Sequence, residues 1–164
     1  MKNEAKDNGR LIIEEDLIER NIDADDFAEA ITVLSRNFLR KNYVKRTFPD
    51  ALIEREKTFP TGLETNRLGI AIPHTDPKHV IKGSLGIGIL KNPVTFQAMD
   101  TKKDVPVSII FMLAITHPAS QLKTLQKIME LIRDEQALLD IKNAKNKSGV
   151  MMVIDSFFGD LLEK

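Results

Sequence analysis

The apolar run "VPVSIIFMLAI", residues 105–115, constrains the fold of this chain more than any other stretch of the sequence. Successive side chains of a strand point to opposite faces, and in this run few polar side chains fall on either face. Both faces of a strand here therefore need an apolar cover. The run is broken by Pro106 and Ser108 and is too short to cross a bilayer as a helix. It therefore predicts a central strand in a sheet that is covered on both faces.

Two shorter runs of branched aliphatic residues predict further strands beside this one. They are "LGIAI" at 68–72 and "SLGIGIL" at 84–90, and turn residues separate them. Near the start of the chain, "RLIIE" at 10–14 is a candidate for another short strand. The stretch "FPTGLETNRLG", 59–69, is rich in turn residues and predicts a loop that leads into the first of these runs.

Helical periodicity precedes these strands. Asp25 or Asp26 can cap a helix that runs to about Lys41. The apolar residues of this helix recur at helical spacing: Phe27, Ala30, Ile31, Val33, Leu34 and Phe38. A second, shorter helix is predicted over 47–58, where Pro49 suits the first turn.

Helical periodicity returns from Pro118 onward. One apolar stripe recurs at helical spacing in this segment: Leu122, Leu125, Met129 and Ile132. Two further helical segments fill 135–146 and 148–162. Helices, then strands, then helices predict an α/β fold, with one mixed β-sheet flanked by helices on both sides.

Length and composition favour one domain. The chain has 164 residues, of which 42% are hydrophobic, and this is enough for a sizeable core. Residues 1–9 are polar and charged and predict a flexible N-terminal tail, followed by a single domain over 10–164. The sequence shows neither a signal-peptide core nor a membrane span, so we expect a cytoplasmic protein with no direct membrane insertion.

Charge and residue usage argue against several functions. With 24 basic and 24 acidic side chains, the net charge of +0 gives no general attraction to nucleic acid or anionic lipid. One tyrosine and no tryptophan leave little aromatic surface on which bases could stack. The sequence contains no cysteine, which excludes disulfides, a thiol nucleophile and a cysteine-bound metal.

A histidine follows the predicted strand 68–72 almost directly. In "AIPHT", Pro73 restricts the backbone and removes one donor, so the His74 imidazole is presented with little freedom. A residue just past a strand end has rigid neighbours and reaches the surface where open sheets bind ligands. With an ordinary pKa of about 6.5, the ring is largely neutral at pH 7 and keeps one free lone pair. His74 is therefore a candidate nucleophile, and a plain structural histidine is the alternative.

Three other polar residues are singled out, Arg55, Thr61 and Gln121, and neither composition nor spacing brings them to His74. Arg55 offers a planar fork of donors for phosphate, or it pairs with a nearby glutamate on an exposed helix face. Thr61 in "FPTG" is most simply a turn residue, and Gln121 is most simply a first-turn helix side chain.

The histidines do not predict a metal site. His74 and His79 are separated by Pro77 and cannot share a helical face, and no spacing ties His117 to either of them. We expect His79 and His117 to be solvated surface residues and expect no metal or organic cofactor.

The stretch "LIEREKTFPTGLETNRLGIAIPHT" resembles the active-site region of phosphotransferase system (PTS) enzyme IIA domains of the fructose–mannitol superfamily. That pattern combines an Arg-Glu helix, a loop with Pro and Thr, and a strand that ends in Ile-Pro-His. The resemblance extends through "VPVSIIFMLAI" and "SQLKTLQKIMELI" and covers roughly residues 10–160. The combination of "FPTG", "AIPH" and "SQLKTL" is most similar to the galactitol-type branch.

The resemblance implies a role for each candidate residue. His74 matches the phosphorylated histidine, and Arg55 matches the arginine that contacts the phosphoryl group. Gln121 occupies the position at which fructose- and mannitol-type members carry a second histidine. Glutamine cannot donate a charged hydrogen bond, so stabilisation of the phosphoryl group would rely more on Arg55, backbone amides and hydroxyls such as that of Thr61.

The resemblance also implies partners and a reaction. The chain would be a phosphotransferase that accepts phosphate from the phosphocarrier protein HPr on His74. It would pass the phosphate to a cognate enzyme IIB, which works with a membrane enzyme IIC, for coupled sugar uptake and phosphorylation; galactitol is the sugar that the resemblance suggests. One alternative is a regulatory relative in which phosphorylation of His74 controls a binding partner. A scaffold protein with an inactive site is another alternative, which Gln121 keeps open.

Overall fold

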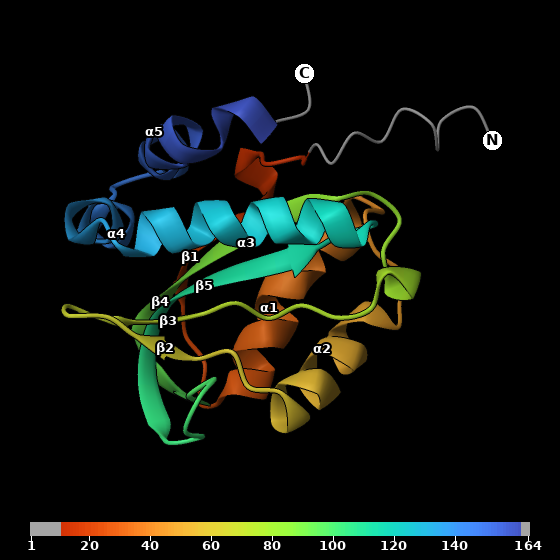
Figure 1. Ribbon diagram of the computed structural model, residues 1–164, viewed down its shortest axis with the longest axis horizontal. Helices are drawn as coiled ribbons and strands as arrows, with labels where there is room; N and C mark the ends of the chain where they lie inside the picture. Colours follow the sequence, from red (N-terminus) through yellow and green to blue (C-terminus); the bar gives the residue numbers. More distant parts are fainter. Residues whose placement is uncertain (1–10, 162–164) are drawn as a thin grey trace.

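The computed structural model describes residues 11–161, so the tail predicted over 1–9 lies outside the described residues. In chain order, the helices and strands are β1 (Ile18–Ile22), α1 (Phe27–Arg40), α2 (Phe48–Thr58), β2 (Leu63–Glu64), β3 (Gly69–Ala71), β4 (Ser84–Gln97), β5 (Asp104–Ala114), α3 (Pro118–Ile132), α4 (Glu135–Asn143) and α5 (Lys147–Phe158) (Figure 1). Short 3-10 turns are η2 (Glu15–Leu17), η3 (Pro77–His79) and η4 (Gly159–Leu161). Within the described part of the chain, every helix is too short or too polar to cross a membrane.

The strands form one five-stranded sheet in the order β1-β4-β5-β3-β2. The sheet is mixed: β1 runs parallel to β4 and β3 runs parallel to β5, whereas the β4–β5 and β2–β3 pairs are antiparallel. Strand β5 comes from the long apolar run and lies in the middle of this order, as the sequence predicts.

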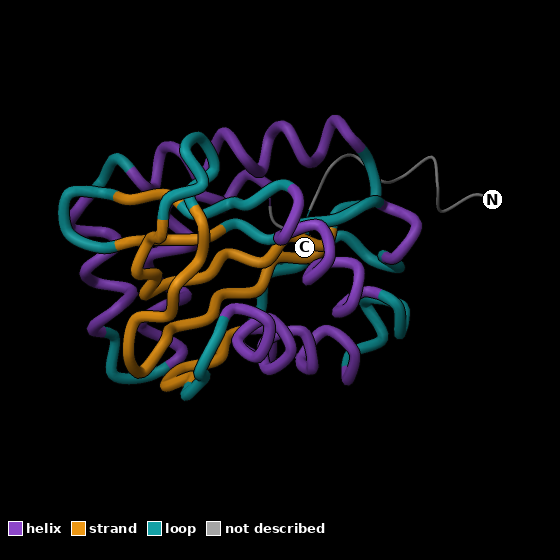
Figure 2. The backbone as a smooth tube through the Cα atoms, turned by 90° about the horizontal axis from the view of Figure 1, so that it is seen from below, coloured by secondary structure: helices purple, strands orange, loops and turns teal. Residues whose placement is uncertain are grey.

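Helices cover both faces of the sheet, which confirms the predicted fold class (Figures 1 and 2). Helices α1 and α2 pack on one face, and α3, α4 and α5 pack on the other. Alternate residues of β5 enter the two cores: Phe111 and Leu113 pack with α3–α5, and Ile110 and Met112 pack with α1 and α2. A central strand with two covered faces explains why the run 105–115 is so apolar.

Helix α1 forms where the aspartate signal predicts it. Asp26 is the N-cap, and its side chain accepts a hydrogen bond of 2.8 Å from the backbone N–H of Glu29. The apolar face of the helix packs closely on β4, because a Cβ atom added at Gly86 would lie 2.6 Å from the Phe38 ring. Gly86 therefore sets how near α1 can approach the sheet.

The strand predicted at 10–14 is wrong. In the described residues Leu11 and Ile12 form isolated bridges rather than a strand, and Ile12 pairs with Ser84, although Leu11 and Ile13 are buried. The first strand of the sheet is instead β1, "IERNI", which was not predicted. Because β1 lies at the sheet edge and pairs only with β4, it tolerates polar residues that conceal its strand character.

The apolar stripe of α3 is only partly buried. Leu122 is 59% exposed and Met129 is 39% exposed. The residues that face the sheet most fully are Thr124, Ile128 and Leu131. Both sets have helical spacing, so periodicity alone could not separate them, and the polar Thr124 hid the correct face.

Candidate active site

His74 lies just beyond the C-terminal end of β3, on backbone that is held from two sides. The backbone N–H of Ile72 donates to the hydroxyl of Thr61 at 2.9 Å. The carbonyl of Pro73 accepts from the N–H of Leu113 in β5 at 2.9 Å. The half-buried imidazole is therefore attached to a segment with little freedom to move.

One ring nitrogen of His74 is committed to the backbone. Nδ1 lies 2.8 Å from the carbonyl oxygen of Ile72. A carbonyl oxygen can only accept, so Nδ1 carries the proton and Nε2 keeps the lone pair. Burial lowers the pKa of His74, the bond to Ile72 opposes this change, and the positive charge of Arg55 lowers the pKa further. The ring is consequently neutral near pH 7, and Nε2 is the nitrogen that keeps a lone pair.

Arg55 lies in the last turn of α2, and its charge acts on the His74 ring. The guanidinium stacks on Phe59, with 5.2 Å between Cζ and the ring centroid. Its Nε atom is buried and has no hydrogen-bond partner among the described residues. A buried donor without an acceptor is costly in a folded protein, and an anionic ligand at this position would satisfy it.

Thr61 supports the strand end rather than facing outward. The residue is 4% exposed, and its hydroxyl donates to the Glu56 carboxylate at 2.9 Å and 3.1 Å. The same hydroxyl accepts from Ile72 N, and the backbone N–H of Thr61 donates to Glu56 at 2.7 Å. These bonds occupy the hydroxyl, so the geometry favours the supporting role over direct phosphate contact.

Glu56 is a residue of this site that the sequence did not single out. It is 5% exposed, and burial raises the pKa of its carboxyl to about 7, although the hydrogen bonds from Thr61 oppose that rise. In the sequence it lies within the charged stretch "EREK", which suggests a solvated helix face. Only its position before the Pro-Thr loop could have hinted at a buried role.

Gln121 lies in the first turn of α3, and its backbone N–H donates to the carbonyl of His117 at 3.1 Å. Strands β3 and β5 are parallel, so their C-terminal ends reach the same edge of the sheet. His74 follows β3 and α3 follows β5, which brings the first turn of α3 to the same edge as His74. Among the described residues, no hydrogen bond joins the Gln121 side chain to His74, Arg55 or Thr61.

The other two histidines lie elsewhere. His79 Nδ1 is 2.7 Å from the hydroxyl of Thr47, and this exposed hydrogen bond joins η3 to the N-cap of α2. His117 is exposed at the N-cap of α3. Within residues 11–161, no group of three or more His, Asp or Glu side chains could hold a metal ion.

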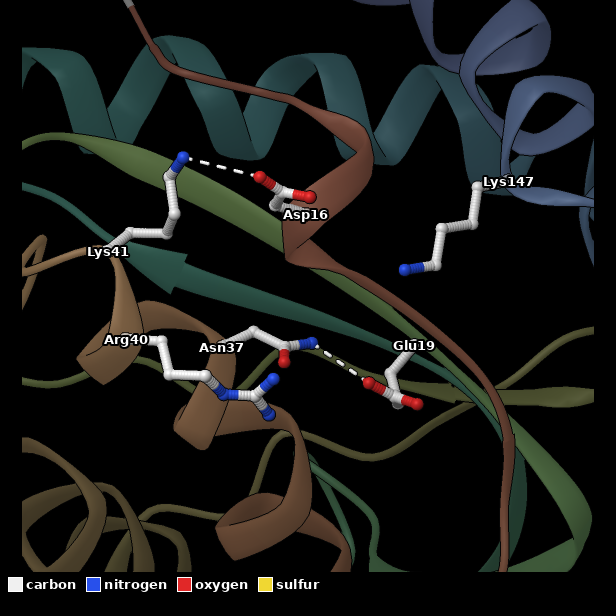
Figure 3. Close-up of a pocket in the computed structure, with 6 residues that line it drawn as sticks. All are labelled: Asp16, Glu19, Asn37, Arg40, Lys41 and Lys147. Carbon is white, nitrogen blue, oxygen red and sulfur yellow. Dashed lines mark hydrogen bonds and ion pairs between the residues drawn. The ribbon is translucent and has the colours of Figure 1, made fainter.

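A separate polar pocket of about 290 Å³ lies between η2, β1, the C-terminal end of α1 and the start of α5 (Figure 3). Its lining residues are Asp16, Glu19, Asn37, Arg40, Lys41 and Lys147. Lys41 forms an ion pair with Asp16 at 3.3 Å, and Asn37 donates to Glu19 at 3.1 Å. None of the predicted site residues lines this pocket, so we place the candidate active site at His74.

Residues 11–157 match the family of the phosphoenolpyruvate-dependent sugar phosphotransferase system, EIIA 2, and the chain belongs to this family. It is similar to the PTS system galactitol-specific EIIA component of Escherichia coli strain K12. The two are 38% identical over 101 residues, which cover 62% of this chain and 67% of the relative. The chain is therefore a phosphoryl-carrying phosphotransferase component of a sugar phosphotransferase system.

Solved structures share the fold. The crystal structure described as the PTS IIA protein PtxA of Streptococcus mutans superposes with a TM-score of 0.74 at 22% identity, and covers 92% of this chain and 95% of that one. Enzyme IIA for mannitol of E. coli, in its complex with phosphorylated enzyme IIB, gives a TM-score of 0.71 at 16% identity and covers 88% and 99% of the two chains. At these identities the likeness establishes the mixed, helix-flanked sheet and nothing finer.

Proposed function

We propose that His74 is the phosphoryl acceptor of this chain and that Nε2 is the atom that attacks. The donor is the phosphorylated phosphocarrier protein HPr, and the recipient is a cognate enzyme IIB that works with a membrane enzyme IIC. The observation that carries the proposal is the bond from Nδ1 to the Ile72 carbonyl, which leaves Nε2 as the nucleophilic nitrogen of a half-buried, neutral ring.

Acceptance of the phosphoryl group is an in-line substitution at phosphorus. The Nε2 lone pair forms the new N–P bond while the bond from phosphorus to the donor histidine breaks, and its electron pair stays with the donor. The His74 ring becomes positively charged as the bond forms, which strengthens the hydrogen bond from Nδ1 to Ile72. Rigid attachment of the ring contributes the orientation on which such a transfer depends.

Arg55 supplies the charge that the phosphoryl group needs. A phosphoryl oxygen beside Nε of Arg55 would give this buried donor its acceptor. One unit charge about 4 Å from another gains about 4 kcal/mol at an effective dielectric constant of 20, before desolvation is counted. Because Gln121 is neutral, Arg55 is the principal cationic group in this proposal.

The sugar and the partners are argued from the relatives. The E. coli relative is named as galactitol-specific, and the E. coli mannitol IIA protein was solved in complex with a phosphorylated IIB. We propose a galactitol-type system in which this chain acts in the cytoplasm and discharges to its own IIB.

Incubation with phosphoenolpyruvate, enzyme I and HPr, followed by intact mass measurement, tests the proposal. The chain should gain one phosphoryl group, and addition of the cognate IIB should remove it. His74→Ala should abolish the gain, whereas the matched variants His79→Ala and His117→Ala should keep it. A chain that gains the group but never discharges to IIB would instead be a regulatory protein, and labelling of His74→Ala would refute the assignment of His74.

A further inference from the structure

Glu56 and Thr61 join α2 to the end of β3 through a continuous series of hydrogen bonds. The carboxylate of Glu56 accepts from the N–H of Thr61 at 2.7 Å and from its hydroxyl at 2.9 Å. The hydroxyl accepts from the N–H of Ile72 at 2.9 Å. The carbonyl of Ile72 accepts from Nδ1 of His74 at 2.8 Å.

We propose that Glu56 is a positioning residue for phosphoryl transfer, whose ionised carboxylate acts through Thr61 to hold Ile72 and thereby orients the His74 imidazole. The proposal rests on the proposed function of His74. Both polar backbone groups of Ile72 are used in this network, one toward Thr61 and one toward His74. A loss of the first bond therefore loosens the residue that fixes the ring.

The ionised form of Glu56 fits this network better than the neutral form. The Thr61 hydroxyl has one proton, which it gives to the carboxylate, and a lone pair then remains for the Ile72 N–H. A protonated Glu56 carboxyl would itself be a donor toward the Thr61 hydroxyl. The Glu56 proton and the Thr61 hydroxyl proton would then compete for the same contact, and one of them would have no acceptor. The state of Glu56 thus decides how firmly Thr61 can hold Ile72.

Burial works against this ionised form. It raises the pKa of Glu56 to about 7, and only the two hydrogen bonds from Thr61 oppose it. No charged group of another element contributes to this shift in the described structure. The neighbouring Lys57 pairs with Glu54 on the exposed side of α2, and Arg55 acts on His74. The orientation of His74 therefore changes with pH near neutrality.

Glu56→Gln tests whether the Glu56 carboxylate affects the rate of phosphoryl transfer. Glu54→Gln, on the same helix, is the matched control. The single-turnover rate of acceptance from phosphorylated HPr is measured from about pH 5.5 to about pH 8.5, across the ordinary pKa of histidine. The wild type and Glu54→Gln should show an ionisation near neutrality in addition to that of His74. Glu56→Gln should lose this additional ionisation and be roughly fivefold slower above neutrality, as expected for one lost hydrogen bond.

Nitrogen NMR of the His74 ring in the unphosphorylated protein tests the positioning directly. The wild type should show Nδ1 protonated and Nε2 free, whereas Thr61→Val should show a mixture of the two tautomers. Thr61→Ser, which keeps the hydroxyl, should restore the single tautomer and the rate. A folded Glu56→Gln with an unchanged pH profile, or a Thr61→Val ring that keeps its tautomer, would overturn the proposal. Failure of the proposed function would look different, because the wild type itself would then accept no phosphoryl group at His74.

Discussion

The guanidinium of Arg55 lies over the ring of Phe59, with 5.2 Å from Cζ to the ring centroid, although Phe59 is 60% exposed. A cation–π contact of this kind uses none of the guanidinium N–H donors. The buried Nε has no partner in the described part of the chain, and the charge acts on His74. Arg55 thus combines a contact with an aromatic ring and a buried Nε donor without a partner, as the proposed phosphoryl contact requires.

Arg55→Lys should slow phosphoryl transfer although the charge is kept. Lysine lacks the planar fork and the stacking face, and the lost charge-assisted hydrogen bond predicts a rate roughly tenfold lower or more. The measurement is single-turnover acceptance from phosphorylated HPr. Arg67→Lys, on an exposed arginine that pairs with Glu135, is the control and should be unaffected. Equal rates for Arg55→Lys, Arg55→Ala and the wild type would show that Arg55 has no part in the reaction.

The His74 ionisation in the acceptance rate should have a midpoint below the ordinary histidine value of about 6.5, separate from the Glu56 ionisation near neutrality. The pKa of His74 is lowered mainly by burial, and the protonated ring has no lone pair with which to attack. Titration of the His74 ring protons by NMR gives the midpoint independently of the donor protein. A titration midpoint above 6.5 would show that burial and the charge of Arg55 do not lower the pKa of His74.

The free energy of unfolding should decrease between about pH 4.5 and about pH 7 because of Glu56. Its pKa is raised from 4.5 in the unfolded chain to about 7 in the folded one, so the folded state binds the extra proton and loses this advantage as the pH rises. A shift of this size corresponds to roughly 3 kcal/mol. His74, whose folded pKa is lowered, contributes with the opposite sign below about pH 6.5.

Urea unfolding of the wild type and Glu56→Gln at several pH values isolates the Glu56 contribution, because His74 is present in both. The stability of Glu56→Gln relative to the wild type should rise with pH across this window. Glu54→Gln, at an exposed glutamate, should show no such trend. A constant difference between Glu56→Gln and the wild type would mean that Glu56 does not titrate abnormally.

Gln121→His should add an ionisation to the pH profile of acceptance. An imidazolium at this edge of the sheet could bind the phosphoryl oxygens, so the rate below neutrality should rise relative to the wild type. Gln121→Ala should slow acceptance modestly, since one neutral hydrogen bond is worth about 1 kcal/mol. Rates are compared with the same phosphorylated HPr, because the donor brings its own histidine. Unchanged behaviour of both variants would place Gln121 outside the active site.

Local signals in the sequence were sufficient to predict those elements whose signals agree with their tertiary surroundings. Asp26 and the apolar spacing after it predicted α1, and Pro49 in a first turn predicted α2. The apolar run 105–115 predicted the central strand, because only a strand covered on both faces needs such a composition. Together these elements were enough for the fold class. The segment Gly69–Ala71, followed by Pro73, was enough to single out His74 at a strand end.

Which polar residues contact one another depends on the tertiary arrangement of the elements. The edge strand β1 depends on pairing with β4, and the buried face of α3 depends on how the helix lies on the sheet. Glu56 looks like a solvated helix residue until the loop after α2 folds back and brings Thr61 to both its carboxylate and the Ile72 N–H. Periodicity records whether a residue is apolar, whereas hydrogen bonds between polar groups from different elements depend on the path of the chain between them. That path determines which ring nitrogen of His74 is free and which side chains hold it.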